Sequence, residues 1–125
     1  MFDGGMGTSL YDKGIFINTC FDELNLMNAD LVRDVHREYV AAGADVIETN
    51  TFGANRFKLA AYGLEKRVHE VNQAGAKIAV SAAADKALVA GSVGPLGVQI
   101  EPLGKISLEE ARAAFKEQVQ GLVDG

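Results

Sequence analysis

Glu48-Thr49-Asn50-Thr51-Phe52-Gly53-Ala54-Asn55 is the stretch of sequence that decides the fold of this chain. A mostly apolar run at 44–47 leads into it, and helical spacing begins at 57–59. A strand that ends in polar residues and turns into a helix is typical of the carboxyl edge of a parallel sheet, where α/β proteins bind ligands. The same order of strand, polar turn and helix occurs twice more, which predicts an α/β fold.

The composition is that of a globular domain, since 48% of the 125 residues are hydrophobic and the charges are mixed. A net charge of −5 with scattered basic residues argues against a nucleic-acid partner. No apolar run reaches the roughly 20 residues that span a bilayer, and the start of the chain lacks a secretory signal. The lone Cys20 suits a reducing compartment. We therefore expect a cytoplasmic protein with no membrane partner.

Three strand–helix units can be placed along the sequence. Phe2 is expected to be the stub of a first strand that runs into a glycine-rich turn at 3–8. An irregular excursion at 11–26 follows. A helix then starts with Asn28 as its N-cap and stops at Gly43.

The second unit has a strand at 45–49, a short helix at 55–62 and a longer helix. The buried stripe of that longer helix is predicted to be Val68, Val71, Gly75, Ile78 and Ala82. The third strand, 87–90, is nearly all apolar, so we expect it to be covered on both faces. After a loop to residue 104, Ser107 and Glu110 form a capping box for a helix whose apolar positions are Ala111, Phe115, Val119 and Leu122.

These units predict an α/β fold class with the first three βα units of a (β/α)8 TIM barrel, incomplete in this chain. A closed barrel of this kind typically needs about 250 residues. Residues 1–125 are therefore expected to be the amino-terminal part of such a barrel domain. The alternative is a small open α/β domain that binds a small ligand without catalysis.

The first candidate site is the turn Asp3-Gly4-Gly5-Met6-Gly7-Thr8. Glycines let backbone N–H groups approach an anion closely, and Asp3 can accept hydrogen bonds from an ammonium group. Such a pair of properties suits a zwitterionic amino acid. The alternative is a plain turn in which Asp3 only caps its own loop. The spacing matches neither a dinucleotide-binding fingerprint nor a P-loop.

The second candidate site is the end of the second strand, where alternation puts Glu48 and Asn50 on one face and Thr51 on the other. Asn50 can donate and accept hydrogen bonds, so it could orient a substrate without changing its protonation state. Asn50 and Thr51 could equally cap the following segment. In the third loop, Gly94 and Pro95 could keep the backbone low beneath a ligand, although turn chemistry explains them as well.

The remaining reactive residue types point to no further site. His36 and His69 lie in amphipathic helices, where we expect them to be solvated. Cys20 has no cysteine or histidine at metal-ligand spacing. We therefore predict neither a metal-binding residue nor a catalytic residue within this chain.

Taken together, the motifs resemble the homocysteine S-methyltransferase family, which includes the homocysteine-binding module of cobalamin-dependent methionine synthase and betaine–homocysteine methyltransferase. The matching elements occur in family order and cover essentially the whole chain: Asp3-Gly4-Gly5-Met6-Gly7-Thr8, Glu23-Leu24-Asn25-Leu26, Ala42-Gly43-Ala44-Asp45, Thr49-Asn50-Thr51-Phe52-Gly53-Ala54-Asn55 and Gly94-Pro95-Leu96-Gly97. The segment 20–25 looks most like bacterial members with a fused methylenetetrahydrofolate reductase domain.

The resemblance implies a barrel that binds homocysteine at its carboxyl edge and transfers a methyl group to its thiolate to give methionine. In the family a zinc ion held by three cysteines activates the sulfur. Those cysteines lie in later strands and nothing in this chain matches them, so we expect the 125 residues alone to be inactive. The expected partners are homocysteine, the remainder of the barrel and a possible fused folate, cobalamin or reductase domain.

The resemblance also assigns roles by position. Asp3 and the backbone of residues 4–8 would hold the amino-acid end of homocysteine. Asn50 and Thr51 would line the pocket, Glu48 would stand beside it, and Gly94 with Pro95 would border it. The methyl donor is open between methylcobalamin, betaine, S-methylmethionine and methyltetrahydrofolate-linked schemes. An unrelated TIM-barrel enzyme with a phosphate-type anion site is the other alternative.

Overall fold

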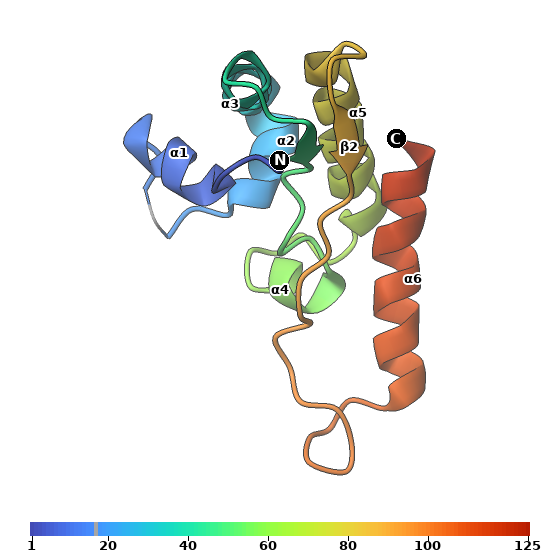
Figure 1. Ribbon diagram of the computed structural model, residues 1–125. Coiled ribbons are helices and arrows are strands. Elements are labelled where there is room, and N and C mark those ends of the chain that lie inside the picture. Colours follow the sequence, from blue (N-terminus) through green and yellow to red (C-terminus); the bar gives the residue numbers. More distant parts are fainter. Residues whose placement is uncertain (17) are drawn as a thin grey trace.

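A computed structural model of the chain describes residues 1–16 and 18–125 as helices packed around a small parallel sheet (Figure 1). In chain order the elements are α1 (Met6–Asp12), the 3-10 turn η1 (Phe21–Glu23), α2 (Leu24–Met27), α3 (Ala29–Ala41), β1 (Val46–Glu48), α4 (Arg56–Ala60), α5 (Val68–Ala83), β2 (Leu88–Ala90) and α6 (Leu108–Asp124). Within the described residues, none of these helices has the length and apolar character that crossing a bilayer requires.

The sheet joins the starts of the three predicted units. β1 pairs with β2 in parallel, with Ile47 opposite Val89, and Phe2 forms a parallel bridge to Val46 on the other side of β1. The Asp3 N–H continues this pairing by donating to the Val46 carbonyl at 2.9 Å. The predicted parallel order is therefore confirmed, and the carboxyl ends of the paired segments lie at one edge of the sheet.

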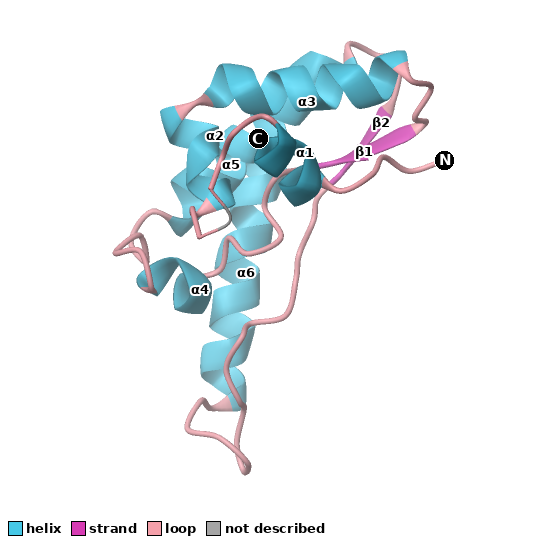
Figure 2. Cartoon of the chain, turned by 90° about the vertical axis from the view of Figure 1, so that its left-hand side faces the viewer, coloured by secondary structure: helices cyan, strands magenta, loops and turns pink. Residues whose placement is uncertain are grey.

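Helices α3 and α5 cover one face of this sheet. Ile47 is fully buried against Ala79 and Ala83 of α5, with Tyr39 of α3 packed against the same cluster. Figure 2 shows α3 running across the top of the molecule, above the strands. On β2, Leu88 is 73% exposed, so the expectation that both faces of this strand are covered is wrong for the described chain. The reason is that α5 packs on one side of the sheet only.

The long helix α5 carries the predicted stripe, since Val68, Val71, Gly75, Ile78 and Ala82 are all buried. It packs against both α3 and α6, which makes it the central helix of the described residues.

Helix α6 presents a different face from the one predicted. Its buried positions are Ala111, Ala114, Gln118 and Gly121. By contrast, Val119 is 44% exposed. The helices approach closely at Gly121, where a Cβ atom would lie 2.8 Å from the Asn72 Cβ. Small residues allow this contact, and apolar periodicity alone does not reveal it.

Two other expectations also need correction. The glycine-rich turn is shorter than predicted, because α1 already begins at Met6, and the excursion at 11–26 contains η1 and α2. His36 is fully buried in α3 instead of solvated, whereas His69 is partly exposed and hydrogen-bonded to Asp124. Asn28 does occupy the N-cap of α3, although its side chain makes no capping hydrogen bond.

The Ser107 cap of α6 provides a test of the local structure. Its Oγ accepts a hydrogen bond from the Glu110 N–H at 3.0 Å. We expect Ser107→Ala to lower the free energy of unfolding by about 1 kcal/mol, because that first-turn N–H loses its acceptor. Urea unfolding followed by circular dichroism measures the change. Ser81→Ala, at an exposed position in α5, is the matched control, and an equal effect of both substitutions would contradict the cap.

Candidate functional site

A cavity of about 350 Å³ lies where the glycine-rich turn meets the end of β1. Eight of the residues proposed from the sequence line it, together with six that the sequence did not indicate. The predicted ones are Asp3, Gly4, Gly5, Met6, Gly7, Glu48, Asn50 and Thr51, and the others are Phe21, Asp22, Thr49, Phe52, Gly53 and Ser92. Thr8, Gly94 and Pro95 are not among the lining residues.

Asp3 connects the first strand to the second. Its Oδ2 accepts a hydrogen bond from the Glu48 N–H at 3.1 Å, so the carboxylate does more than cap its own loop. Burial raises the pKa of Asp3 above its ordinary value, and the nearby negative charge of Glu48 adds to this, while the Glu48 N–H opposes it. The carboxylate is thus a partly desolvated acceptor at the cavity wall.

The glycine-rich turn is held against α3 by Tyr39. The Tyr39 hydroxyl lies within hydrogen-bonding distance of Ser9 Oγ at 3.0 Å and of the Gly5 carbonyl at 3.3 Å. A Cβ atom on Gly4 would stand 2.7 Å from that hydroxyl, so glycine is needed at this position. Helix α1 then starts at Met6 without any side-chain cap. Its first N–H groups therefore lack partners within the helix.

The Asn50 side chain uses most of its hydrogen-bonding groups within the protein. Its Nδ2 donates to the Phe21 carbonyl at 2.8 Å and to Asn25 Oδ1 at 3.2 Å. Asn25 returns a hydrogen bond of 2.8 Å to the Asn50 carbonyl. Both amide hydrogens of Asn50 are therefore in use, and only its Oδ1 could serve a ligand. A ligand group bound there has to be a hydrogen-bond donor.

Hydrogen bonds of Thr51 and Thr49 connect the end of β1 to the segment that follows β2. The Thr51 hydroxyl donates to the Ser92 carbonyl at 2.7 Å, and the Ser92 N–H donates to Thr49 Oγ1 at 2.9 Å. Because the Thr51 proton is committed to Ser92, the 2.6 Å bond between the two hydroxyls must have Thr49 as its donor. The hydroxyl protons of both threonines are thus occupied, so neither hydroxyl can donate a hydrogen bond to a ligand.

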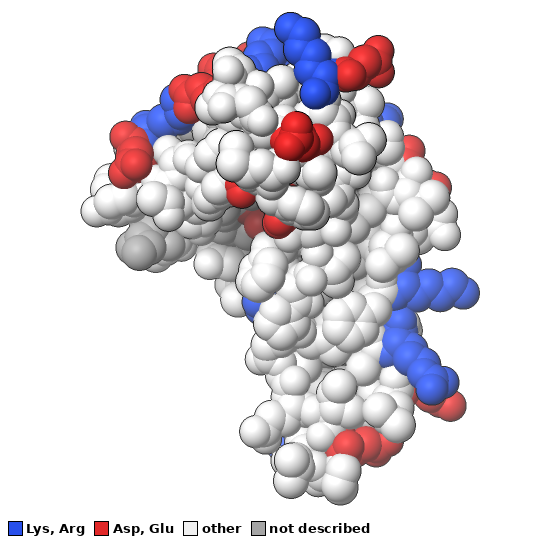
Figure 3. Space-filling view, viewed as in Figure 1, with Lys and Arg blue, Asp and Glu red and all other residues white. Residues whose placement is uncertain are grey.

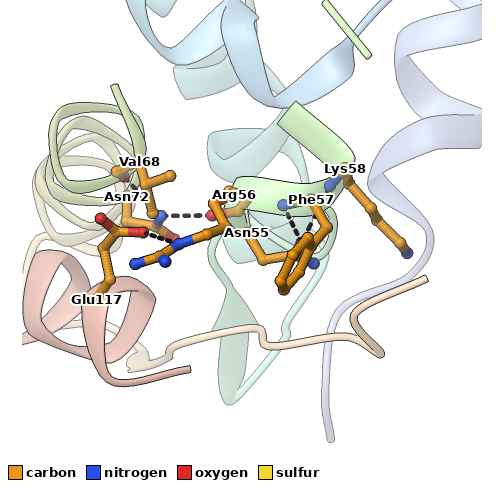
Figure 4. A network of polar contacts seen from close by, with 8 residues as sticks. Asn55, Arg56, Phe57, Lys58, Val68, Asn72 and Glu117 are labelled. Atoms are coloured by element: carbon orange, nitrogen blue, oxygen red, sulfur yellow. Dashed lines mark hydrogen bonds and ion pairs between the residues drawn. The ribbon is translucent and has the colours of Figure 1, made fainter. Parts of the chain in front are cut away.

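Buried amides hold the loop that follows β1. Asn72 of α5 donates to the Ala54 carbonyl at 2.8 Å, and Gln118 of α6 donates to the Thr51 carbonyl at 2.7 Å. Asn55 caps α4 by accepting from the N–H groups of Phe57 and Lys58, both at 3.0 Å (Figure 4). Polar residues inside apolar helical stripes were the only sequence signal for Asn72 and Gln118.

Gly94 and Pro95 brace this loop from outside the cavity. The Gly94 N–H donates to the Phe52 carbonyl at 3.1 Å, and a Cβ atom on Gly94 would lie 2.6 Å from that oxygen. The Pro95 carbonyl accepts a hydrogen bond of 3.4 Å from Asn55. Glycine at position 94 is therefore explained by its contact with Phe52.

The charges around the cavity are acidic. Asp3, Asp22 and Glu48 line it, and among its described lining residues there is no lysine, arginine or histidine. The space-filling view shows acidic atoms beside a hollow near the middle of one face, with most basic side chains at its margins (Figure 3). Such a site favours ligands that carry a cationic group.

The described residues do not form a metal site. Within residues 1–16 and 18–125, no group of three or more His, Cys, Asp or Glu side chains could hold a metal ion. Burial raises the pKa of the Cys20 thiol, which disfavours the thiolate that metals bind. The described residues therefore do not supply the zinc ligands, which the resemblance places in later strands.

Comparison with known proteins points to one family. The family model described as homocysteine S-methyltransferase matches residues 1–125. The chain is 35% identical to the methionine synthases of Mycobacterium leprae and Mycobacterium tuberculosis over 98% of its length, and it spans 11% of either relative. Its fold superimposes on the oxidized form of the Escherichia coli homocysteine methyltransferase MmuM with a TM-score of 0.81 and 28% identity. This match covers 98% of the chain and 48% of MmuM, and the metallated form of MmuM has the same TM-score.

Proposed function

The chain belongs to the homocysteine S-methyltransferase family, and on that premise we propose that it supplies part of the homocysteine pocket of an S-methyltransferase. The observation that carries this proposal is the cavity in which the glycine-rich turn meets the end of β1. It supports the proposal because it brings together two motifs that are about 45 residues apart in the sequence and that the family resemblance rests on.

The proposed ligand contacts follow the chemistry of an α-amino acid. Asp3 accepts hydrogen bonds from the ammonium group of homocysteine, and the backbone N–H groups at the start of α1 face its carboxylate. Asn50 Oδ1 accepts from a donor of the ligand, since its amide hydrogens are already bonded. Thr51 and Glu48 complete the wall.

We further propose that these βα units form part of a larger (β/α)8 barrel. The match to 48% of the MmuM chain supports this, as does the exposed face of β2. The metal that activates the thiol would be held by residues other than those described. The catalytic step is therefore not assigned to any residue of this chain.

The alternative of a phosphate-binding barrel enzyme is disfavoured by the charges. Three carboxyl groups line the described cavity and no described lining side chain is basic, so a phosphate would be repelled. The family match likewise disfavours an unrelated barrel and a complete non-catalytic module.

Calorimetric titration of the full-length protein with homocysteine tests the proposal. We expect Asp3→Asn to weaken homocysteine binding by about 10- to 100-fold, because a hydrogen bond between two charged groups contributes roughly 1.5–3 kcal/mol. The asparagine oxygen can still accept from the Glu48 N–H, so the fold is preserved.

Asp85→Asn is the matched control, since Asp85 is exposed and its left-handed backbone conformation suits asparagine. Wild-type protein that fails to bind homocysteine would contradict the proposed function. Unchanged binding by the Asp3→Asn variant would contradict only the role of Asp3.

A further inference from the structure

Asp22 is a buried carboxylate to which the family resemblance assigns no role. It lies in η1 and is only 9% exposed. It lines both the main cavity and a second one of about 340 Å³, and Gly53 also lines both. A Cβ atom built on Gly53 would lie 3.0 Å from Asp22 Oδ2, which places that oxygen beside the backbone shared by the two cavities.

No side chain in the part of the chain that the structure describes donates a hydrogen bond to Asp22. The Gly53 N–H is the backbone group that favours its ionised form, and Lys58 is the positive charge that attracts it. Lys58 forms no ion pair with Asp22 among the described residues. Its ammonium group lies 5.1 Å from the centre of the Phe52 ring. Asp22 is thus buried without a bonded cation, which is unfavourable for a structural carboxylate.

Asp3 resembles Asp22 in that its hydrogen-bonding partner is a backbone N–H, that of Glu48, whereas both amide hydrogens of Asn50 are bonded. The N-cap of η1 is Cys20, so Asp22 does not cap that turn. Burial raises the pKa of Asp22 to about 6, so it is mostly ionised at neutral pH while poorly solvated. A cationic ligand group beside it would supply the missing partner.

We propose, resting on the function proposed above, that Asp22 binds the α-ammonium group of homocysteine as a second carboxylate of the cavity that Asp3 also lines. The cavity that they share contains no basic side chain among its described lining residues, and Lys58 lines only the second cavity. Asp22 is then a specificity residue: it selects thiols that carry an amino group over thiols that do not. No bond is made or broken by Asp22 in this role.

The test compares homocysteine with 4-mercaptobutanoate, which has the same thiol and carboxylate but no amino group. Binding of both is measured by calorimetry with the full-length protein. Asp22→Asn is expected to weaken homocysteine binding by about 10- to 100-fold and to change 4-mercaptobutanoate binding by less than about threefold. Asp22→Glu, which keeps the charge on a longer side chain, is expected to retain more of the discrimination.

Asp12→Asn is the matched control, because Asp12 is exposed and lies outside both cavities. If Asp22→Asn weakens both ligands equally, Asp22 has a structural role and the inference is overturned while the proposed function stands. If the wild-type protein does not bind homocysteine, the proposed function fails, and this inference fails with it.

Discussion

Between pH 6.5 and pH 4, the His36→Leu variant is expected to lose up to about 3 kcal/mol less free energy of unfolding than the wild-type protein loses. His36 is fully buried, and neither ring nitrogen has a hydrogen-bond partner among the described residues. Burial lowers its pKa from 6.5 to about 4. Below pH 6.5 the unfolded chain takes up a proton that the folded chain refuses, so stability is lost as the pH falls towards 4.

Asp22 acts in the opposite direction over nearly the same pH range. Burial raises its pKa from 3.8 to about 6, so the folded chain takes up a proton before the unfolded chain does. Stability is therefore gained as the pH falls from about 6 to 3.8, by up to roughly 3 kcal/mol. In the wild-type protein the contributions of His36 and Asp22 offset each other.

Urea unfolding at pH 4, 5, 6 and 7 separates these contributions. His36→Leu leaves the contribution of Asp22, and its stability relative to wild type should rise with acidity. Asp22→Asn leaves the contribution of His36, and its relative stability should fall. The double variant removes both, and its stability should follow the pH dependence of the wild-type protein. Parallel pH curves for wild type and His36→Leu would contradict the burial of a neutral histidine.

Asn25→Ala is expected to lower the free energy of unfolding by about 2–4 kcal/mol. The Asn25 amide donates to the carbonyls of Asn50 and Val71, at 2.8 and 3.2 Å, and its oxygen accepts from Asn50. An unsatisfied buried polar group costs roughly 1–3 kcal/mol, and the vacated volume adds to this. The groups that lose their Asn25 partner are the Asn50 carbonyl, one amide hydrogen of Asn50 and the Val71 carbonyl.

The matched control is Asn28→Ala, because Asn28 is exposed and its side chain makes no capping hydrogen bond. Urea unfolding at pH 7 measures both variants. We also expect Asn25→Ala to weaken homocysteine binding, since Asn50 loses its two hydrogen bonds with Asn25 and keeps the one to the Phe21 carbonyl. Equal stability of the two variants would show that Asn25 does not support the loop after β1.

Helices and strands could be predicted where the sequence signals that form them come from neighbouring residues. The apolar spacing of α5, the Ser107 cap and the polar end of β1 all depend on residues within a few positions of one another. The glycine-rich turn and the strand-end cluster could be joined into one candidate site because parallel strands end at a common edge. The cavity confirms that they lie together.

The errors came from contacts between segments far apart in the sequence. The buried face of α6 depends on the close approach of Gly121 to α5. His36 has the spacing of a surface residue, yet it is fully buried. Asp22 lies in a segment without periodicity, so its sequence context did not distinguish it.

The sequence by itself determined the parallel α/β plan and the motifs of the family, because strand ends, glycine turns and caps depend on residues that are neighbours in the sequence. Only the tertiary structure decided which polar groups are free. Asn50 and Thr51 use their donors within the framework, whereas Asp22 is buried without a bonded cation. The physical reason is that η1, α2 and the segment after β2 supply the hydrogen-bond partners at the end of β1, and these segments are far from it in the sequence.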